Sequence, residues 1–221
     1  TAMDLATAIL LTIVTASTPL LLAAIGELVV ERSGVLNLGV EGMMLMGAAC
    51  GFAAAFSTGS PALGILAAMA AGMAMAALFA ALVLGLFANQ VACGLALTIL
   101  GLGLSGLIGQ GFVGQRIDPM ARVAIPLLAD LPLLGPILFR QDPFVYASFA
   151  LVGLAAWFLS ATRPGLVLRA VGDNHASAHA LGHPVRRIRF LAVLFGGACA
   201  GLAGGYLSLV YTPFWVTGMS A

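Results

Sequence analysis

The sequence predicts an all-α protein, a polytopic transmembrane helical bundle with about six spans. Hydrophobic residues make up 62% of the 221 residues and charged residues only 8%, and the mean hydropathy is +1.11. A soluble domain contains about 45–50% apolar and about 25% charged residues, and its polar residues cover its surface. This chain has too few polar residues for such a surface, which excludes a water-soluble globular domain.

Six runs of the chain are long and apolar enough to cross a bilayer, a distance that requires about 20 mostly apolar residues. Each run is free of charged residues except the second, which contains Glu41. We expect all of them to form one transmembrane domain over residues 1–221. The runs are Leu5–Gly26, Val35–Phe56, Pro61–Phe87, Val91–Val113, Phe144–Ala161 and Leu191–Val210.

Loop charges predict the orientation of the spans, because arginine and lysine near span ends remain in the cytoplasm. The connection over about residues 162–190 contains five arginines and one acid, Asp173, and we expect it to be cytoplasmic. The connection over about residues 114–143 contains three arginines, three aspartates and several prolines, and we expect it to be extracytoplasmic. Alternation then places Glu27–Gly34 in the cytoplasm and the N-terminus outside.

The motif LNLGVEGMM places a carboxylate, Glu41, within the second run. Gly39 and Gly42 flank it and Asn37 precedes it by four residues, a composition that forms helix poorly and predicts a bent or broken helix. Transporters place such breaks beside their substrate, and an ionisable residue within the membrane indicates function. Asn37, Gly39, Glu41 and Gly42 are therefore candidate pathway residues. Alternatively, Glu41 caps the start of a helix near the cytoplasmic boundary, where the helix dipole favours an acid.

A second group of charges, Glu27, Glu31 and Arg32, is typical of a solvated turn at the membrane boundary. Glu27 fits this interpretation least, because it lies within the apolar sequence AAIGELVV. The basic connection contains a more structured pattern. Gly172 predicts a turn, Asp173 and Asn174 are candidate N-caps, and a short alanine-rich helix would end at Gly182. Such a helix is either a docking element or an ordinary amphipathic connector.

Several enzymatic and binding chemistries are not expected. The three histidines, His175, His179 and His183, have helical spacing, but no carboxylate or cysteine completes a metal site. The sequence GLSG around Ser105 resembles a serine-protease motif, yet no span contains a histidine to serve as base. The chain has no lysine and hence no phosphate-binding loop of the GxxxxGK[ST] type, so we expect ATP hydrolysis only in a separate subunit. A net charge of +1 indicates no nucleic-acid partner.

Three stretches occur in an order that resembles a known family. They are GVLNLGVEGMMLMGA, ANQVACGLALTILGLGL and LRAVGDNHASAHALGHPVRRIRFLAVLFGGACAGLAGGYLSL, within a resemblance that covers about Pro19–Ser220. They resemble permease subunits of bacterial ABC importers, in the branched-chain amino acid and simple-sugar superfamily and its nucleoside-type branch. In that family the helix with the pattern RAVG(E/D)N is the cytoplasmic coupling helix that docks on the ATPase. The positions that match it are Arg169, Gly172, Asp173, Asn174, Ala178 and Gly182. His175 stands in place of a usual proline, and His183 in place of a usual apolar residue.

The resemblance implies a multi-pass permease of the bacterial inner membrane that works by alternating access. Its implied partners are two cytosolic ATPase subunits, which bind ATP and Mg²⁺, a second homologous permease, an extracytoplasmic solute-binding protein or lipoprotein, and membrane lipid. The expected solute is a nucleoside first, then a simple sugar, then a branched-chain amino acid. The family continues beyond Ser220, so we expect Ala221 to lie within a longer native chain. The alternative is a secondary transporter or channel driven by an ion gradient, in which Glu41 would carry protons.

Overall fold

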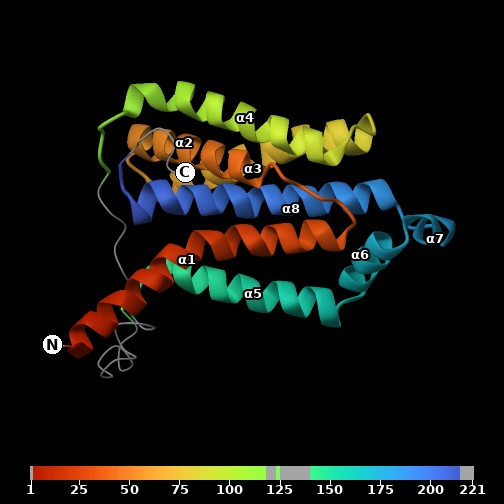
Figure 1. The fold of residues 1–221 in the computed structure, drawn as a ribbon, viewed down its shortest axis with the longest axis horizontal. Helices are drawn as coiled ribbons and strands as arrows, with labels where there is room; N and C mark the ends of the chain where they lie inside the picture. Colours follow the sequence, from red (N-terminus) through yellow and green to blue (C-terminus); the bar gives the residue numbers. More distant parts are fainter. Residues whose placement is uncertain (1, 118–122, 125–139, 215–221) are drawn as a thin grey trace.

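The computed structural model describes residues 2–117, 123–124 and 140–214, and it is an all-α bundle (Figure 1). Six helices within these residues are long and apolar enough to cross a membrane, so the chain is a multi-pass membrane protein. Two shorter helices, α6 (Arg163–Asp173) and α7 (His175–Ala180), stand at one end of the bundle. The long helices are α1 (Ala2–Arg32), α2 (Val40–Thr58), α3 (Pro61–Ala80), α4 (Gln90–Gly109), α5 (Pro143–Ala161) and α8 (Val185–Tyr206).

Short elements extend or connect these helices. A π-helical turn, η1 (Ala81–Gly85), continues α3, and a second one, η4 (Leu207–Tyr211), continues α8. A 3₁₀ turn, η2 (Gln110–Phe112), follows α4. Two strands of two residues each, β1 (Val123–Ala124) and β2 (Arg140–Gln141), pair antiparallel between α4 and α5. This pairing is too small to change the all-α class.

Helix α8 is the central element of the bundle. It packs against α1, α2 and α3, while α4 covers the outer side of α2 and α5 covers α1 (Figure 1). In α8 67% of the residues of the span are buried, compared with 22% in α4 and in α5. Helices α4 and α5 are apolar and leave most of their surface exposed. Such a surface suits contact with lipid or with another subunit.

The ends of three helices differ from the sequence prediction. Helix α1 contains Pro19 and continues past Gly26 to Arg32, and Gly34, with a φ of +81°, lies in the turn that follows it. Helix α2 begins at Val40, so residues 35–39 of the predicted span are not helical. Helix α8 begins at Val185, six residues before the predicted span, and it therefore includes three of the arginines that we had assigned to a connection.

The connections alternate between the two ends of the bundle as the sequence predicts. The links after α1 and α3 lie at the end that carries α6 and α7, while the link after α2 and the N-terminus lie at the opposite end (Figure 1). Most of the predicted extracytoplasmic connection, residues 118–122 and 125–139, lies outside the described residues. The described links agree with the predicted alternation of the spans.

Glycines allow the central helices to approach one another closely. A Cβ atom built on Gly47 would lie 2.5 Å from the carbonyl oxygen of Gly201, which places α2 directly against the backbone of α8. A Cβ on Gly72 of α3 would overlap the carbonyl oxygen of Gly197 on α8. Small residues at helix interfaces pack membrane helices in this way. In the sequence GACAGLAGG of α8, Gly197, Gly201 and Gly205 recur every four residues, and this spacing places them on one face of the helix for such packing.

The contact between α3 and α8 can be tested with a matched pair of glycine substitutions. Gly72→Ala adds a methyl group against the α8 backbone, and we expect it to lower the stability of the purified protein by about 1–3 kcal/mol. Gly103→Ala adds the same group in α4 with no neighbouring atom within 4 Å, so it should leave stability unchanged or slightly improved. Thermal unfolding in detergent measures both effects, and equal melting temperatures for the two variants would contradict the packing model.

Candidate functional site

The link between α1 and α2, which we name the returning segment (residues 33–39), runs back into the bundle. The backbone N–H of Leu36 donates to Oε1 of Gln90 over 2.7 Å, and the hydroxyl of Thr98 donates to the carbonyl of Leu38 over 3.1 Å. These partners are two turns apart on α4, a distance of about 12 Å along the helix axis. Helix α2 therefore starts partway along the bundle, about two turns from the start of α4, and not at the end of the bundle.

Residues of the returning segment are not helical, so side chains accept the hydrogen bonds of some of its backbone N–H groups. The N–H of Asn37 donates to Oε1 of Glu27 over 3.0 Å, and the N–H of Gly39 donates to Oδ1 of Asn37, also over 3.0 Å. The side-chain N–H of Asn37 points to the sulfur of Met43, 3.6 Å away on α2. An unsatisfied backbone group costs several kcal/mol in a membrane. The buried Asn37 therefore determines the local turn that starts α2.

Gly39 and Gly42 bring the start of α2 against α4. A Cβ on Gly42 would lie 2.6 Å from the carbonyl oxygen of Leu97, and one on Gly39 would lie 2.9 Å from the Leu97 side chain. On the facing helix, a Cβ on Gly94 would lie 2.8 Å from the backbone nitrogen of Leu38. Asn37, Gly39 and Gly42 thus lie together in the packed region between α2 and α4.

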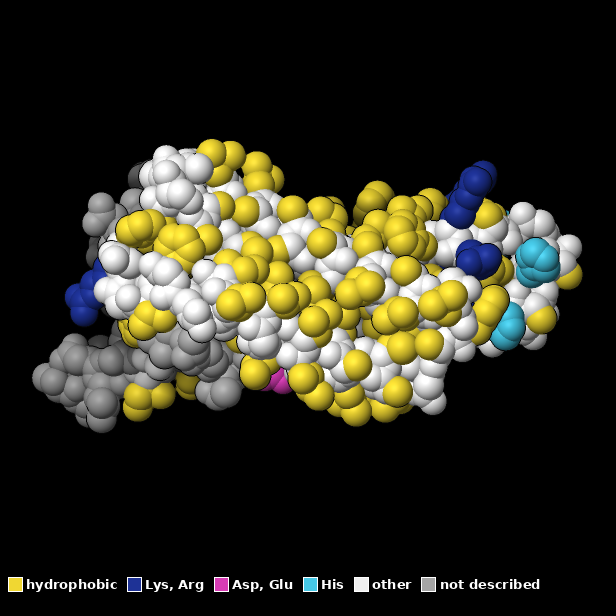
Figure 2. Space-filling model, turned by 90° about the horizontal axis from the view of Figure 1, so that it is seen from above, with side chains coloured by type: hydrophobic (Ala, Val, Ile, Leu, Met, Phe, Trp, Pro, Cys, Tyr) yellow, Lys and Arg dark blue, Asp and Glu magenta, His cyan; other side chains and the backbone are white. Residues whose placement is uncertain are grey.

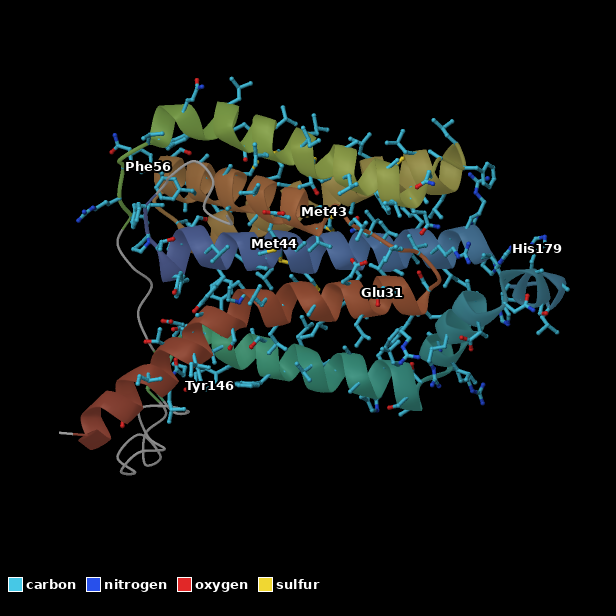
Figure 3. The ribbon with its side chains drawn as sticks, viewed as in Figure 1. Glu31, Met43, Met44, Phe56, Tyr146 and His179 are labelled. Carbon is cyan, nitrogen blue, oxygen red and sulfur yellow. The ribbon has the colours of Figure 1, made fainter. Side chains whose placement is uncertain are left out.

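Glu41 occupies the first turn of α2 and is exposed, unlike its buried neighbours Gly42, Met43 and Met44. In Figure 3, Met43 and Met44 mark the part of the bundle in which α2 begins. An acid in a first helical turn interacts favourably with the helix dipole, as the capping interpretation requires. Its exposure next to a broken helix is also what the pathway interpretation requires. Both interpretations of Glu41 therefore remain predictions.

Glu27 has a larger structural role than the sequence indicated. Its Oε1 atom accepts the hydrogen bond from Asn37, and its Oε2 atom is buried without a hydrogen-bond partner in the described part of the chain. Glu31 and Arg32 are exposed at the end of α1, as expected of a boundary. In the sequence, Glu27 differs from Glu31 and Arg32 by its apolar neighbours. An acid in an apolar sequence within a membrane span indicates a specific role.

The predicted coupling region consists of two helices and not of one. Helix α6 continues through Gly172 to Asp173, so the predicted turn at Gly172 is wrong and Asp173 is not an N-cap. Asn174 is the N-cap of α7, where its Oδ1 accepts the N–H of Ser177 over 3.0 Å. Gly182, with a φ of +84°, follows the end of α7. Ala178 is the buried residue of α7, and Arg169 lies in α6 with a buried Nε that has no partner among the described residues.

Gly172 of α6 lies where the end of α1 and the returning segment leave no room for a side chain. A Cβ on Gly172 would overlap the carbonyl oxygen of Arg32 and would lie 3.1 Å from the nitrogen of Gly34. From the other side, Nε of Arg189 on α8 donates to the carbonyl of Ser33 over 3.0 Å. The returning segment is thus held by α1, α4, α6 and α8 together.

The remaining candidate chemistries have ordinary structural explanations. Ser105 is buried in α4, where its hydroxyl donates to the carbonyl of Leu102 over 3.1 Å. His175 and His179 are exposed on α7, and Figure 3 shows His179 at the end of the bundle. In the described ranges, no group of three or more His, Cys, Asp or Glu side chains has an arrangement that could bind a metal ion.

Comparison with known proteins identifies relatives over nearly the whole chain. A protein of Haloferax volcanii with the provisional name of a glucose ABC transporter permease, TsgC13, is 43% identical over 99% of this chain. The guanosine ABC transporter permease NupQ of Bacillus subtilis is 34% identical over 89% of the chain, and the nucleoside ABC transporter permease NupC of Lactococcus lactis is 32% identical over 85%. The chain spans 68%, 66% and 63% of the lengths of these three relatives. No solved structure matches the chain.

The family model agrees with these relatives and with the fold. The model described as the permease component of branched-chain amino acid transport systems matches residues 9–221. This range includes all six candidate spans, the returning segment, and α6 and α7. The chain therefore belongs to the family of permease components of branched-chain amino acid transport systems.

Proposed function

We propose that this chain forms part of the solute pathway of an ATP-binding cassette importer, and that the pathway passes the returning segment and the first turn of α2. The observation that carries the proposal is the start of α2 inside the bundle, next to exposed Glu41 and the turn fixed by Asn37. Non-helical backbone within a membrane occurs where it is buried in protein or lines a cavity. The N-terminal end of such a broken helix supplies backbone N–H donors to a solute.

The solute that we propose carries a hydroxylated sugar ring. Two of the three relatives above are named for guanosine or nucleosides and one for glucose, and these compounds share such a ring. Ring hydroxyls are donors and acceptors, so a carboxylate such as that of Glu41 and the N–H groups of a helix start suit them. Nucleosides are the first candidates, simple sugars the second, and branched-chain amino acids the third.

We propose that α6 and α7 couple this pathway to ATP hydrolysis in a separate subunit. Helix α7 projects from the end of the bundle and would dock on a cytosolic ATPase that holds ATP and Mg²⁺ (Figure 1). A movement of α7 would reach the returning segment through Gly172, which touches the backbone of Arg32, and through Arg189, which binds Ser33. If these contacts had a second arrangement, docking of α7 would change access to the pathway.

The complete importer would contain further subunits in the bacterial inner membrane. The proposed partners are two cytosolic ATPases, a second homologous permease, identical or different, and an extracytoplasmic solute-binding protein or lipoprotein. The positive charge near α6 and α8 supports a cytoplasmic position for this end. A secondary transporter driven by an ion gradient is not favoured, since the named relatives are ABC transporter permeases. Uptake into vesicles that requires ATP and persists without an ion gradient would exclude it.

Glu41→Gln tests the pathway in the assembled importer. We expect this change to lower solute uptake about tenfold, because a hydrogen bond to a charged group contributes about 1.5–3 kcal/mol. Glu31→Gln is the control, since Glu31 is an exposed acid at the end of α1 and outside the proposed pathway. Uptake of radiolabelled nucleoside and copurification of the ATPase measure function and assembly separately. Normal uptake by the Glu41 variant would support the capping interpretation instead.

Gly172→Ala tests coupling, because the added methyl group pushes α6 away from Arg32. We expect ATP hydrolysis to continue while uptake per ATP falls severalfold, as the movement of α7 no longer reaches the returning segment. Gly153→Ala is the matched control, a helical glycine in α5 with no neighbouring atom within 4 Å. Both rates are measured on the same proteoliposomes. A parallel fall of hydrolysis and uptake in the Gly172 variant, or no change in their ratio, would refute this route.

A further inference from the structure

An open groove with a volume of about 400 Å³ lies between the end of α3 and the start of α8. Ala80, Ala81, Leu84 and Leu191 line its apolar part, and Arg186 and Arg187 line its rim. A second hollow, of about 350 Å³, shares these two arginines and is also lined by His179 and His183. The two hollows thus meet at a pair of cations, with an apolar groove on one side and a hollow that contains two histidines on the other.

The two arginines present charge that the described residues do not neutralise. Both are exposed, and neither forms an ion pair with a described acidic side chain. The guanidinium carbon of Arg186 lies 6.0 Å from the centre of the Phe87 ring, a distance that permits a cation–π interaction. Phe87 has a φ of +55°, an unfavourable backbone conformation for a bulky residue. The exposed Phe87 ring and the Arg186 cation thus lie together beside the groove.

The position of the groove along the bundle corresponds to the boundary between membrane and water. Arginine and histidine side chains gather at the end of the bundle that carries α7, next to a face on which many hydrophobic side chains are exposed (Figure 2). Leu86, Phe87 and Leu191 are 74%, 81% and 64% exposed. Exposed aromatic and aliphatic side chains beside arginines are typical of helix ends at the headgroup level. The groove therefore opens to lipid along its apolar part and to water at the arginines.

We propose that this groove binds one anionic phospholipid. The phosphate lies between Arg186 and Arg187, the rest of the headgroup occupies the hollow beside His179 and His183, and an acyl chain follows the apolar groove over η1. Charge complementarity supports this occupant, since basic pockets between helices at the cytoplasmic side bind anionic headgroups. An acidic protein surface or a free phosphate ion would match the arginines but would leave the apolar groove unfilled.

The test uses the intact transporter that contains this chain, incorporated in nanodiscs of phosphatidylcholine and phosphatidylglycerol in a four-to-one ratio. After detergent washing, mass spectrometry measures the phosphatidylglycerol that remains bound relative to phosphatidylcholine. We expect the double variant R186Q/R187Q to lower this ratio about tenfold or more, since each arginine near an anionic surface contributes about a fivefold preference. R186K/R187K should retain most of the preference, because it keeps both positive charges.

Arg163→Gln is the matched control, since Arg163 is exposed at the same end of the bundle and does not line the groove. It should leave the lipid ratio unchanged, and the ATPase should copurify with all variants. An unchanged ratio in R186Q/R187Q would overturn the proposal. Loss of the ATPase from that variant with lipid retained would instead identify the arginines as a protein interface. Complete displacement of the lipid by inorganic phosphate would show that the site recognises the phosphate group alone.

Discussion

The bundle depends on one constraint, the need to satisfy backbone hydrogen-bonding groups away from water. Six helices satisfy their own groups, but the returning segment cannot, and it nevertheless lies within the bundle. Glu27, Asn37, Gln90 and Thr98 supply the missing partners from three parts of the chain. Each of these polar side chains binds a backbone group of the returning segment. The place where α2 begins is therefore determined by side chains of α1 and α4.

A second constraint is the distance between helix axes. Glycines on α2, α3 and α8 remove the side chains that would separate the three helices, so their backbones touch. Glycine permits the same close backbone contact at Gly172, where α6 meets the end of α1, and at Gly42, where α2 meets α4. Close backbone contact leaves little freedom for independent movement of single helices. Movements of this subunit should therefore occur as displacements of several packed helices together.

The sequence predicted the larger features because these depend on composition alone. Apolar runs and loop arginines were sufficient for six spans, their alternation and the all-α class. A break near Asn37–Gly42 was predicted from its helix-poor composition, and the structure has one. The exact start of α2 was not predictable, because it depends on contacts of Asn37 with Glu27 and of Gly39 with Leu97, which are distant in the sequence.

The functional residues were predicted less evenly than the fold. Gly172 was interpreted as a turn because glycine is a poor helix former. The structure instead explains the glycine by its close contact with the backbone of Arg32, 140 positions away in the chain, which leaves no room for a side chain. Asn174 was predicted correctly as an N-cap, because capping depends on neighbouring residues alone. The contribution of Glu27 was missed since its partner, the N–H of Asn37, belongs to a segment whose path no local pattern indicates. Local interactions were readable from the sequence, and contacts between distant segments were not.

Helix α8 has a further consequence, because it is a single rigid rod that extends from the basic end into the centre of the bundle. Its 22 residues correspond to a length of about 33 Å. A tilt of about 5° around its midpoint would move each end by about 1.4 Å in opposite directions. At the far end, Tyr206 donates to the carbonyl of Thr15 and Ser208 donates to the carbonyl of Ala48. Because these bonds join this end of α8 to α1 and α2, a tilt of α8 that begins at Arg189 would carry both helices with it at the opposite end of the bundle.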